Sequence, residues 1–182
     1  LRQAQNESDS KGIVEEIKFY VSKLVKPELK INIIYDVCIE LYNKNFKTLA
    51  RELYGEYSEE VDIPRIQAKG AYLKAMLNRG PGRLSELTQA LELAKRVKNK
   101  MLLWKIYSAM GDYYFSRKSY FYAVNYYFDA CEVVRDLVFS LPAKHRVRFI
   151  NHHSASETLY KLLLVKQHYN NIYDEGAERI RN

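Results

Sequence analysis

Apolar side chains recur at intervals of three and four residues along nearly the whole chain, and this spacing most restricts the fold. It places the apolar residues on one face of successive α-helices, while no segment alternates polar and apolar residues long enough to predict a strand. Seven glycines and four prolines among 182 residues are too few for the many turns of a β-sandwich or barrel. The sequence therefore predicts an all-α protein whose short loops make neighbouring helices antiparallel.

Turn-forming residues divide this pattern into separate helices. Pro27 should end the first helix, Pro64 should lie in the first turn of the fourth, and Pro142 should follow a long seventh helix. The clearest turn is the Arg-Gly-Pro-Gly sequence at residues 79–82, and a weak break is expected around Asn170–Asn171. The predicted helices cover residues 13–24, 33–41, 46–57, 64–78, 83–98, 100–117, 119–140 and 143–180, the last range as one helix or two.

The length suits a single domain, which we place at residues 11–182 after a flexible N-terminal segment at residues 1–10. The chain begins at Leu1 rather than with a methionine, so we expect it to be a segment of a longer protein. No apolar run approaches the roughly 18 residues of a membrane span, the longest being stretches such as residues 162–165. Neither end resembles a signal peptide, so we expect no membrane partner.

Residues that could carry chemistry are sparse. Two cysteines, Cys38 and Cys131, are too few for a disulfide framework or a thiolate zinc site, which suggests a reducing, cytoplasmic compartment. Both lie at apolar helical positions, where buried, unreactive thiols are expected. His152 and His153 stand about one helical turn from Glu157, but a metal site needs more ligands. With neither a nucleophile elbow nor a phosphate-binding loop, the sequence predicts no enzyme, no metal and no cofactor.

One segment, between Trp104 and Leu137, carries an internal pattern of large and small residues. In order, these are Tyr107, Met110, Gly111, Tyr114, Tyr120, Ala123, Tyr127 and Ala130. Their spacing resembles the tetratricopeptide repeat (TPR) family, in which two antiparallel helices form a hairpin and hairpins stack into a superhelix. The proline that closes the family's unit is missing, since Arg135 stands there.

Each position of this unit has a steric reason. Gly111 and Ala123 should lie where the two helices approach most closely, because a larger side chain would separate them. Tyr114, Tyr120 and Tyr127 should fill the remaining space between the helices. The same small residues and aromatic stripe also fit an unrelated helical bundle, which is the competing interpretation.

Fainter copies of the unit precede the best one. Gly70, Ala90 and Ala94 match a second unit. Gly70 precedes Gly111, and Ala90 precedes Ala130, by about 40 residues, which is longer than the family's usual period of 34. We place the candidate repeats at about residues 30–60, 64–98 and 100–140, with C-terminal helices at 143–180 as caps. The residues that fit the first, degenerate unit are Ile34, Val37, Cys38, Leu41, Ala50 and Tyr54.

The resemblance implies a non-catalytic scaffold that binds another protein or a peptide in a concave groove. Similar long-period repeats occur in large bacterial signalling and transcription regulators, so we expect a segment of such a protein. Lys105 matches one position of the family's carboxylate clamp, but Asp112 and Ala109 replace its asparagine and arginine, which puts a clamp in doubt. The positions that face the groove by resemblance are Lys105, Ser108, Asp112, Phe115 and Ser116, with Gln67, Ala71, Lys74, Tyr35 and Ile39 in the fainter units.

Two basic clusters offer a different function. The net charge is +7, and cations at the surface attract nucleic acid, anionic lipid or acidic proteins. They also aid solubility, and those near Asn99 suit the C-terminal dipole of the preceding helix. The clusters comprise Lys95, Arg96, Lys98, Lys100 and Lys105, and then Lys144, His145, Arg146 and Arg148.

Three further alternatives remain open. A nucleic-acid-binding helical module would use the basic clusters and would lose affinity steeply with salt. A receptor for a small signalling peptide, as in quorum sensing, would be stabilised by a short peptide. A homodimer could form through exposed end helices. Of these partners, nucleic acid ranks below another protein or a peptide.

Overall fold

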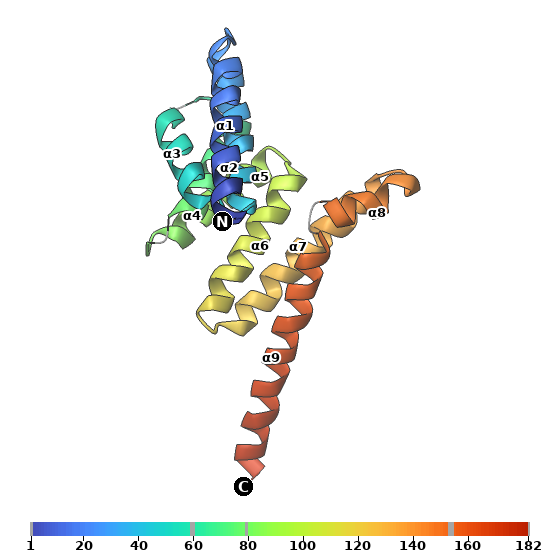
Figure 1. Cartoon of the computed structure of the whole chain (residues 1–182). Helices are drawn as coiled ribbons and strands as arrows, with labels where there is room; N and C mark the ends of the chain where they lie inside the picture. Colours follow the sequence, from blue (N-terminus) through green and yellow to red (C-terminus); the bar gives the residue numbers. More distant parts are fainter. Residues whose placement is uncertain (1, 59–60, 79, 153–154, 182) are drawn as a thin grey trace. The chain divides into compact units, whose positions relative to one another are not determined.

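The computed structural model describes residues 2–58, 61–78, 80–152 and 155–181 (Figure 1). Within these ranges the regular structure is helical and no strand occurs, which confirms the all-α prediction. None of the helices so described is both long and apolar enough to cross a bilayer. The helices are α1 (Arg2–Ser22), α2 (Pro27–Asn43), α3 (Lys47–Tyr57), α4 (Pro64–Leu77), α5 (Arg83–Arg96), α6 (Lys100–Ser116), α7 (Tyr120–Ser140), α8 (Ala143–His152) and α9 (Ala155–Arg181).

Local chemistry accounts for most helix boundaries. Pro27 and Pro64 each begin a helix, where the missing backbone N–H would have had no partner. The Asn99 side chain accepts a hydrogen bond from the backbone N–H of Leu102 at 3.2 Å, so this residue caps α6. The boundaries at Pro64 and Asn99 agree with the sequence prediction. Pro27 was expected to end the first helix, but α1 already ends at Ser22 and Pro27 begins α2, six residues before the predicted start at residue 33.

The turn before α5 is held by Asn78. Its Oδ1 accepts a hydrogen bond from the backbone N–H of Gly80 at 2.7 Å, and its Nδ2 donates to Glu86 Oε2 at 3.0 Å. The predicted turn at residues 79–82 is thus present where it is described, while Arg79 lies outside the described residues.

The predicted break around Asn170–Asn171 is wrong, because α9 runs through both residues. Asparagine in a helix interior costs less than about 1 kcal/mol, too little to end a helix. The described C-terminal region comprises α8 and α9, and residues 153–154 lie outside the described part. Phe149 and Ala155 both pack against Trp104. One straight helix would turn them to different sides at 100° per residue.

The chain divides into two compact units, Leu1–Glu86 (unit 1) and Leu87–Asn182 (unit 2). The sequence predicted one domain over residues 11–182, whereas the division falls within the first turns of α5. In addition, α1 begins at Arg2, within the segment 1–10 that the sequence predicted to be flexible. The two units are described separately below.

In unit 1, α2 packs against α1, α3 and α4. A Cβ added to Gly70 on α4 would lie 3.0 Å from Tyr35 Cε2 on α2, so the glycine gives the ring its space. The Tyr54 ring on α3 lies 5.6 Å from the Tyr35 ring, and its hydroxyl donates to the Gly70 carbonyl at 3.4 Å. Burial raises the pKa of Tyr54 to about 12. This contact holds all three helices together.

A buried lysine also joins α2 to α4. Lys69 is 8% exposed, and its Nζ donates to Asn32 Oδ1 at 2.8 Å and to Asp36 Oδ1 at 2.6 Å. A buried ammonium is tolerated only with such partners. Arg51 on α3 donates a hydrogen bond to the Leu77 carbonyl at 3.2 Å, which gives this carbonyl at the C-terminal end of α4 a partner.

In unit 2, α6 and α7 form an antiparallel hairpin, α9 packs along α7, and α8 contacts both α7 and α9. Figure 1 shows α9 continuing as a single helix beyond the loop that joins α6 to α7. Two apolar clusters form the core. The Trp104 cluster contains Trp104, Ala130 and Ala155 with Phe149 and Ile150 among its partly buried members. The Tyr127 cluster contains Ala123, Tyr127 and Val165 with Phe115, Tyr120 and Leu162.

Three helix–helix turns share one backbone conformation that the sequence did not predict. Asn45, Lys98 and Lys118 have φ values of 68°, 51° and 58°, which is the left-handed region. In each turn the next residue's N–H bonds to a carbonyl five residues earlier, as from Ser119 to Tyr114 at 3.0 Å. The α2–α3 and α6–α7 hairpins therefore turn in the same way, without the glycine usual at this position.

Candidate protein-binding surfaces

The α6–α7 hairpin is closed by a contact between a glycine and a tyrosine. A Cβ added to Gly111 would lie 2.6 Å from Tyr127 Cε1 and 2.7 Å from Cδ1, closer than real side chains pack. Ala123 and Ala130 on α7 are fully buried. Gly111 thus lies at a close contact between α6 and α7, while Ala123 and Ala130 are buried in clusters that also include Val165 and Ala155 of α9.

A ladder of tyrosines covers one side of the same hairpin. Tyr114 stacks on Tyr126 with centroids 5.3 Å apart and planes at 7°, and on Tyr122 at 5.1 Å. Tyr107 continues the ladder, 6.4 Å from Tyr126. Burial raises the pKa of both Tyr107 and Tyr126, which keeps their hydroxyls neutral. These rings therefore serve to pack the hairpin.

Helix α9 packs against the hairpin, and Asp112 of α6 makes a central contact with it. Asp112 Oδ1 accepts a hydrogen bond from the Tyr127 hydroxyl at 2.6 Å and lies 3.0 Å from Lys161 Nζ on α9. Lys161 also lies 3.2 Å from Glu157 Oε1. Burial lowers the pKa of Lys161, but the two carboxylates together raise it above its usual value. The ammonium is therefore fixed between α6 and α9.

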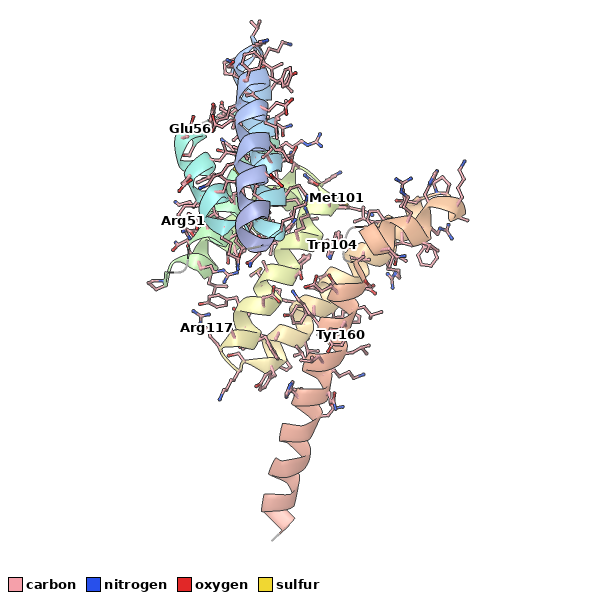
Figure 2. All side chains as sticks on the ribbon, in the orientation of Figure 1. Arg51, Glu56, Met101, Trp104, Arg117 and Tyr160 are labelled. Atoms are coloured by element: carbon pink, nitrogen blue, oxygen red, sulfur yellow. The ribbon has the colours of Figure 1, made fainter. Side chains whose placement is uncertain are left out.

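Apolar and aromatic contacts extend the docking of α9 along the hairpin. The Phe115 ring lies 6.0 Å from that of His168, and Tyr120 stacks on the same histidine at 5.8 Å. At the other end, the buried Trp104, which Figure 2 labels, donates its Nε1–H to Thr158 Oγ1 at 2.9 Å. The side of α9 turned toward the hairpin is thus fixed over about three turns.

These contacts change what the predicted groove residues of unit 2 can do. Asp112 and Phe115, expected to face a partner, are engaged by α9. Lys105 and Ser108 are half-buried, and Ser116 is exposed with its hydroxyl donating to the Tyr113 carbonyl at 2.8 Å. We call Lys105, Ser108 and Ser116 the α6 stripe, which follows one side of the helix at intervals of three and eight residues.

In unit 1 the predicted groove residues divide as well. Gln67 is exposed, and Lys74 is exposed with its Nζ 3.7 Å from Glu86 Oε1. The prediction that Tyr35 faces a groove is wrong, because the side chain is 4% exposed. The absence of a side chain at Gly70 leaves a space on α4 that the Tyr35 ring fills. Of the remaining predicted residues, Ala71 is half-buried and Ile39 is buried, so Gln67 and Lys74 are the exposed ones.

Two cations of the first basic cluster lie near carboxylates of unit 2. Lys100 Nζ lies 3.2 Å from Asp136 Oδ2 on α7, and Lys95 Nζ lies 3.9 Å from Glu92 Oε1. Arg96 and Lys98, from the same cluster, have no ion pair within the described residues. The structure therefore pairs Lys95 and Lys100 with carboxylates but leaves Arg96 and Lys98 without one in the part of the chain that it describes.

The second basic cluster lies on α8 and keeps its charge. Lys144 and Arg148 are exposed, and no carboxylate in the described part of the chain pairs with either. Arg146 is partly buried: its guanidinium lies over the Phe139 ring at 5.4 Å, and its Nε donates to the Leu141 carbonyl at 3.0 Å. The two clusters therefore differ, although the sequence showed them as similar.

No protein-family model, curated protein or solved structure matches this chain. The repeat resemblance therefore rests on the residues of the sequence and on the geometry of the hairpins.

The docking of α9 is the feature that the sequence analysis missed. Its signal was present: among the α9 side chains that the structure describes, Ala155, Thr158 and Val165 are buried, and they recur at intervals of three and seven residues. Lys161 lies three residues after Thr158, on the same side. The outward side carries three exposed apolar residues, Leu159, Tyr160 and Leu163, and a homodimer through end helices stays a prediction.

The candidate metal ligands do not come together where they are described. Among the described residues, no group of three His, Cys, Asp or Glu side chains could hold a metal ion. Glu157 is engaged with Lys161, and His153 lies outside the described residues.

The thiols provide a test of the core of unit 1. Burial raises the pKa of Cys38 to about 12, and burial also raises that of Cys131. The thiolate is the reactive form of cysteine, and a pKa of about 12 leaves far less of it at pH 8 than an ordinary thiol has. Modification of Cys38 should therefore be slower on the order of a thousandfold. Titration with Ellman's reagent should show this slow reaction in the native protein and fast reaction of both thiols in urea. Fast reaction of Cys38 in native buffer would contradict the burial.

Proposed function

We propose that this chain is a non-catalytic scaffold of helical hairpins that binds another protein or a peptide. The observation that supports it is the α6–α7 hairpin, in which Gly111 admits Tyr127 and one side already holds a helix of the same chain, α9. A preorganised helical surface binds by contact and charge alone, so the mechanism needs no covalent step and no cofactor.

In this proposal the partner lies against the α6 stripe, Lys105, Ser108 and Ser116, in unit 2. Gln67 and Lys74 form a second candidate contact that belongs to unit 1. These side chains offer cations and hydrogen-bonding groups for a polar or acidic segment. Asp112 and Phe115 act indirectly, because they hold α9 in place beside the stripe. The binding surface is thus narrower than the sequence alone predicted.

The proposal also places the chain among the long-period TPR proteins, with a superhelix of hairpins as its architecture. The spacing of Tyr107, Gly111 and Tyr127 supports this, as does the common turn at Asn45 and Lys118. By the same resemblance, the chain would be a cytoplasmic segment of a bacterial signalling or transcription regulator. A small signalling peptide would be one possible ligand of the same surface, and thermal stabilisation by a short peptide would identify it.

Photo-crosslinking tests where the partner binds. A crosslinking amino acid would replace the exposed Gln67 or Ser116, and in matched controls the exposed Glu52 or Lys166. In nuclease-treated extract of the native cell, we expect one protein to crosslink at Gln67 and Ser116 but not at the controls. The purified partner should then bind Lys105→Glu/Ser116→Arg about tenfold more weakly than wild type in calorimetry, equivalent to about 1.4 kcal/mol. Crosslinking only at the controls, or unchanged affinity, would overturn the proposal.

A further inference from the structure

Helix α8 is a short basic helix with a fixed orientation. Its inward residues Phe149 and Ile150 pack in the Trp104 cluster, and the Phe149 ring lies 6.3 Å from the Trp104 ring. This anchoring leaves one side of α8 outward, with Lys144, Val147, Arg148 and Asn151 exposed at helical spacing. We call these four residues the α8 face. Because its backbone is held by the core, the α8 face presents its side chains in one arrangement.

The charge on this face is not balanced by the rest of unit 2. Helix α8 contains no acidic residue. The carboxylates at the adjoining end of α7 are already used: Asp136 lies 3.2 Å from Lys100 Nζ, and Glu132 lies 2.6 Å from Arg135 Nη2. Unit 2 as a whole has fifteen Lys and Arg against nine Asp and Glu, whereas unit 1 has fourteen against thirteen. The excess positive charge of the chain is therefore concentrated in the unit that carries α8.

Apolar surface lies among these cations. Val147 is 69% exposed and Phe139, at the end of α7, is 67% exposed. The Arg146 guanidinium lies over Phe139, and its hydrogen bond to the Leu141 carbonyl fixes it there. Large apolar side chains left exposed beside charges are typical of surfaces that bind other proteins.

We propose that the α8 face docks a short acidic protein segment that carries an apolar residue. The carboxylates would pair with Lys144 and Arg148, and the apolar residue would cover Val147 and Phe139. A nucleic acid fits less well, because its evenly spaced phosphates would extend beyond this ten-residue helix. They would then approach the carboxylates of Glu132 and Asp136. Phosphates would also leave the apolar surface uncovered. This site is separate from the α6 stripe and does not depend on it.

The test uses a fluorescein-labelled nine-residue peptide, Asp-Glu-Phe-Asp-Glu-Leu-Phe-Glu-Glu, and the whole chain at low salt. Fluorescence anisotropy should show binding that Arg148→Glu weakens about tenfold and Val147→Ser weakens about threefold. The matched control Lys166→Glu makes the same charge change at an exposed position on α9 and should bind as wild type does. All of these positions are exposed, so circular dichroism should show unchanged helicity and melting.

Each other outcome decides against the proposal. Equal weakening by Arg148→Glu and Lys166→Glu would mean attraction to net charge without a site. Equal binding of a peptide with Gln for each acid would remove the charge argument. Tighter binding of a 12-base-pair DNA duplex, with a steep fall in salt, would assign the face to nucleic acid. Lys105→Glu/Ser116→Arg should leave the labelled peptide bound, so failure of the α6 stripe and failure of the α8 face are distinguishable.

Discussion

Replacing Gly111 with alanine should destabilise unit 2 by about 2 kcal/mol, although alanine is the better helix former. The new Cβ would lie 2.6 Å from Tyr127 Cε1. Tyr127 is 1% exposed and its hydroxyl is held by Asp112 at 2.6 Å, so the ring has no free direction in which to move. Overpacking a core costs about 1–3 kcal/mol and sometimes more, while the gain in helix propensity is about 1 kcal/mol. Urea unfolding followed by circular dichroism measures the difference.

Gly55→Ala is the matched control for this prediction. Gly55 also lies within a helix, but nothing stands within 4 Å of the position of its missing Cβ. Alanine there should therefore stabilise the protein slightly, by up to about 1 kcal/mol. If Gly111→Ala stabilised the protein as much as Gly55→Ala, the close contact between α6 and α7 would not exist. The repeat interpretation of the hairpin would then lose its main support.

Replacing Trp104 with alanine should cost about 3–5 kcal/mol, the range for removing a buried aromatic side chain. Trp104 is 4% exposed and joins three helices of unit 2. It packs near Phe149 of α8 and donates its N–H to Thr158 of α9. The cavity would therefore release α8 as well as lower the stability of the core. Urea unfolding measures the loss, and trypsin should cut first after Lys144 or Arg148 on α8.

Trp104→Phe separates packing from hydrogen bonding in this cluster. The phenyl ring keeps most of the volume but leaves Thr158 Oγ1 without the indole donor, so the cost should be about 1–2 kcal/mol. Unfolding of both variants is followed by far-ultraviolet circular dichroism, because each substitution removes the only tryptophan and with it the tryptophan fluorescence. A Trp104→Ala protein as stable as wild type, with α8 still resistant to trypsin, would contradict the role of the Trp104 cluster.

The sequence was informative wherever local chemistry sets the structure. Pro64 marked a helix start because the ring fixes φ and lacks an N–H, and Pro27 marked the division between α1 and α2. Gly111 and Ala123 indicated a close helix contact because glycine and alanine are the two smallest residues, and a larger side chain at either position would separate the helices. By contrast, Asn170–Asn171 misled the prediction, since a weak helix former does not end a helix whose neighbours favour it.

The candidate site was predicted less well, because exposure depends on residues far away in the sequence. Tyr35 carried no sign that Gly70 would leave room for its ring, 35 residues later. Lys100 looked like part of a basic patch until Asp136 was brought within 3.2 Å of it. The sequence shows which residues are charged or aromatic, but the residues that they contact lie on other helices.

The amino-acid sequence by itself determined that the chain is helical, where most of its helices begin and end, and which small residues lie between α6 and α7. These properties follow from backbone propensity, capping and side-chain size, which act within a few residues. Only the tertiary structure decided that α9 covers Asp112 and Phe115, and that Lys144 and Arg148 on α8 have no carboxylate partner in the described part of the chain. The reason is that ion pairs and buried surface depend on which helix faces pack together, and no local pattern fixes that choice.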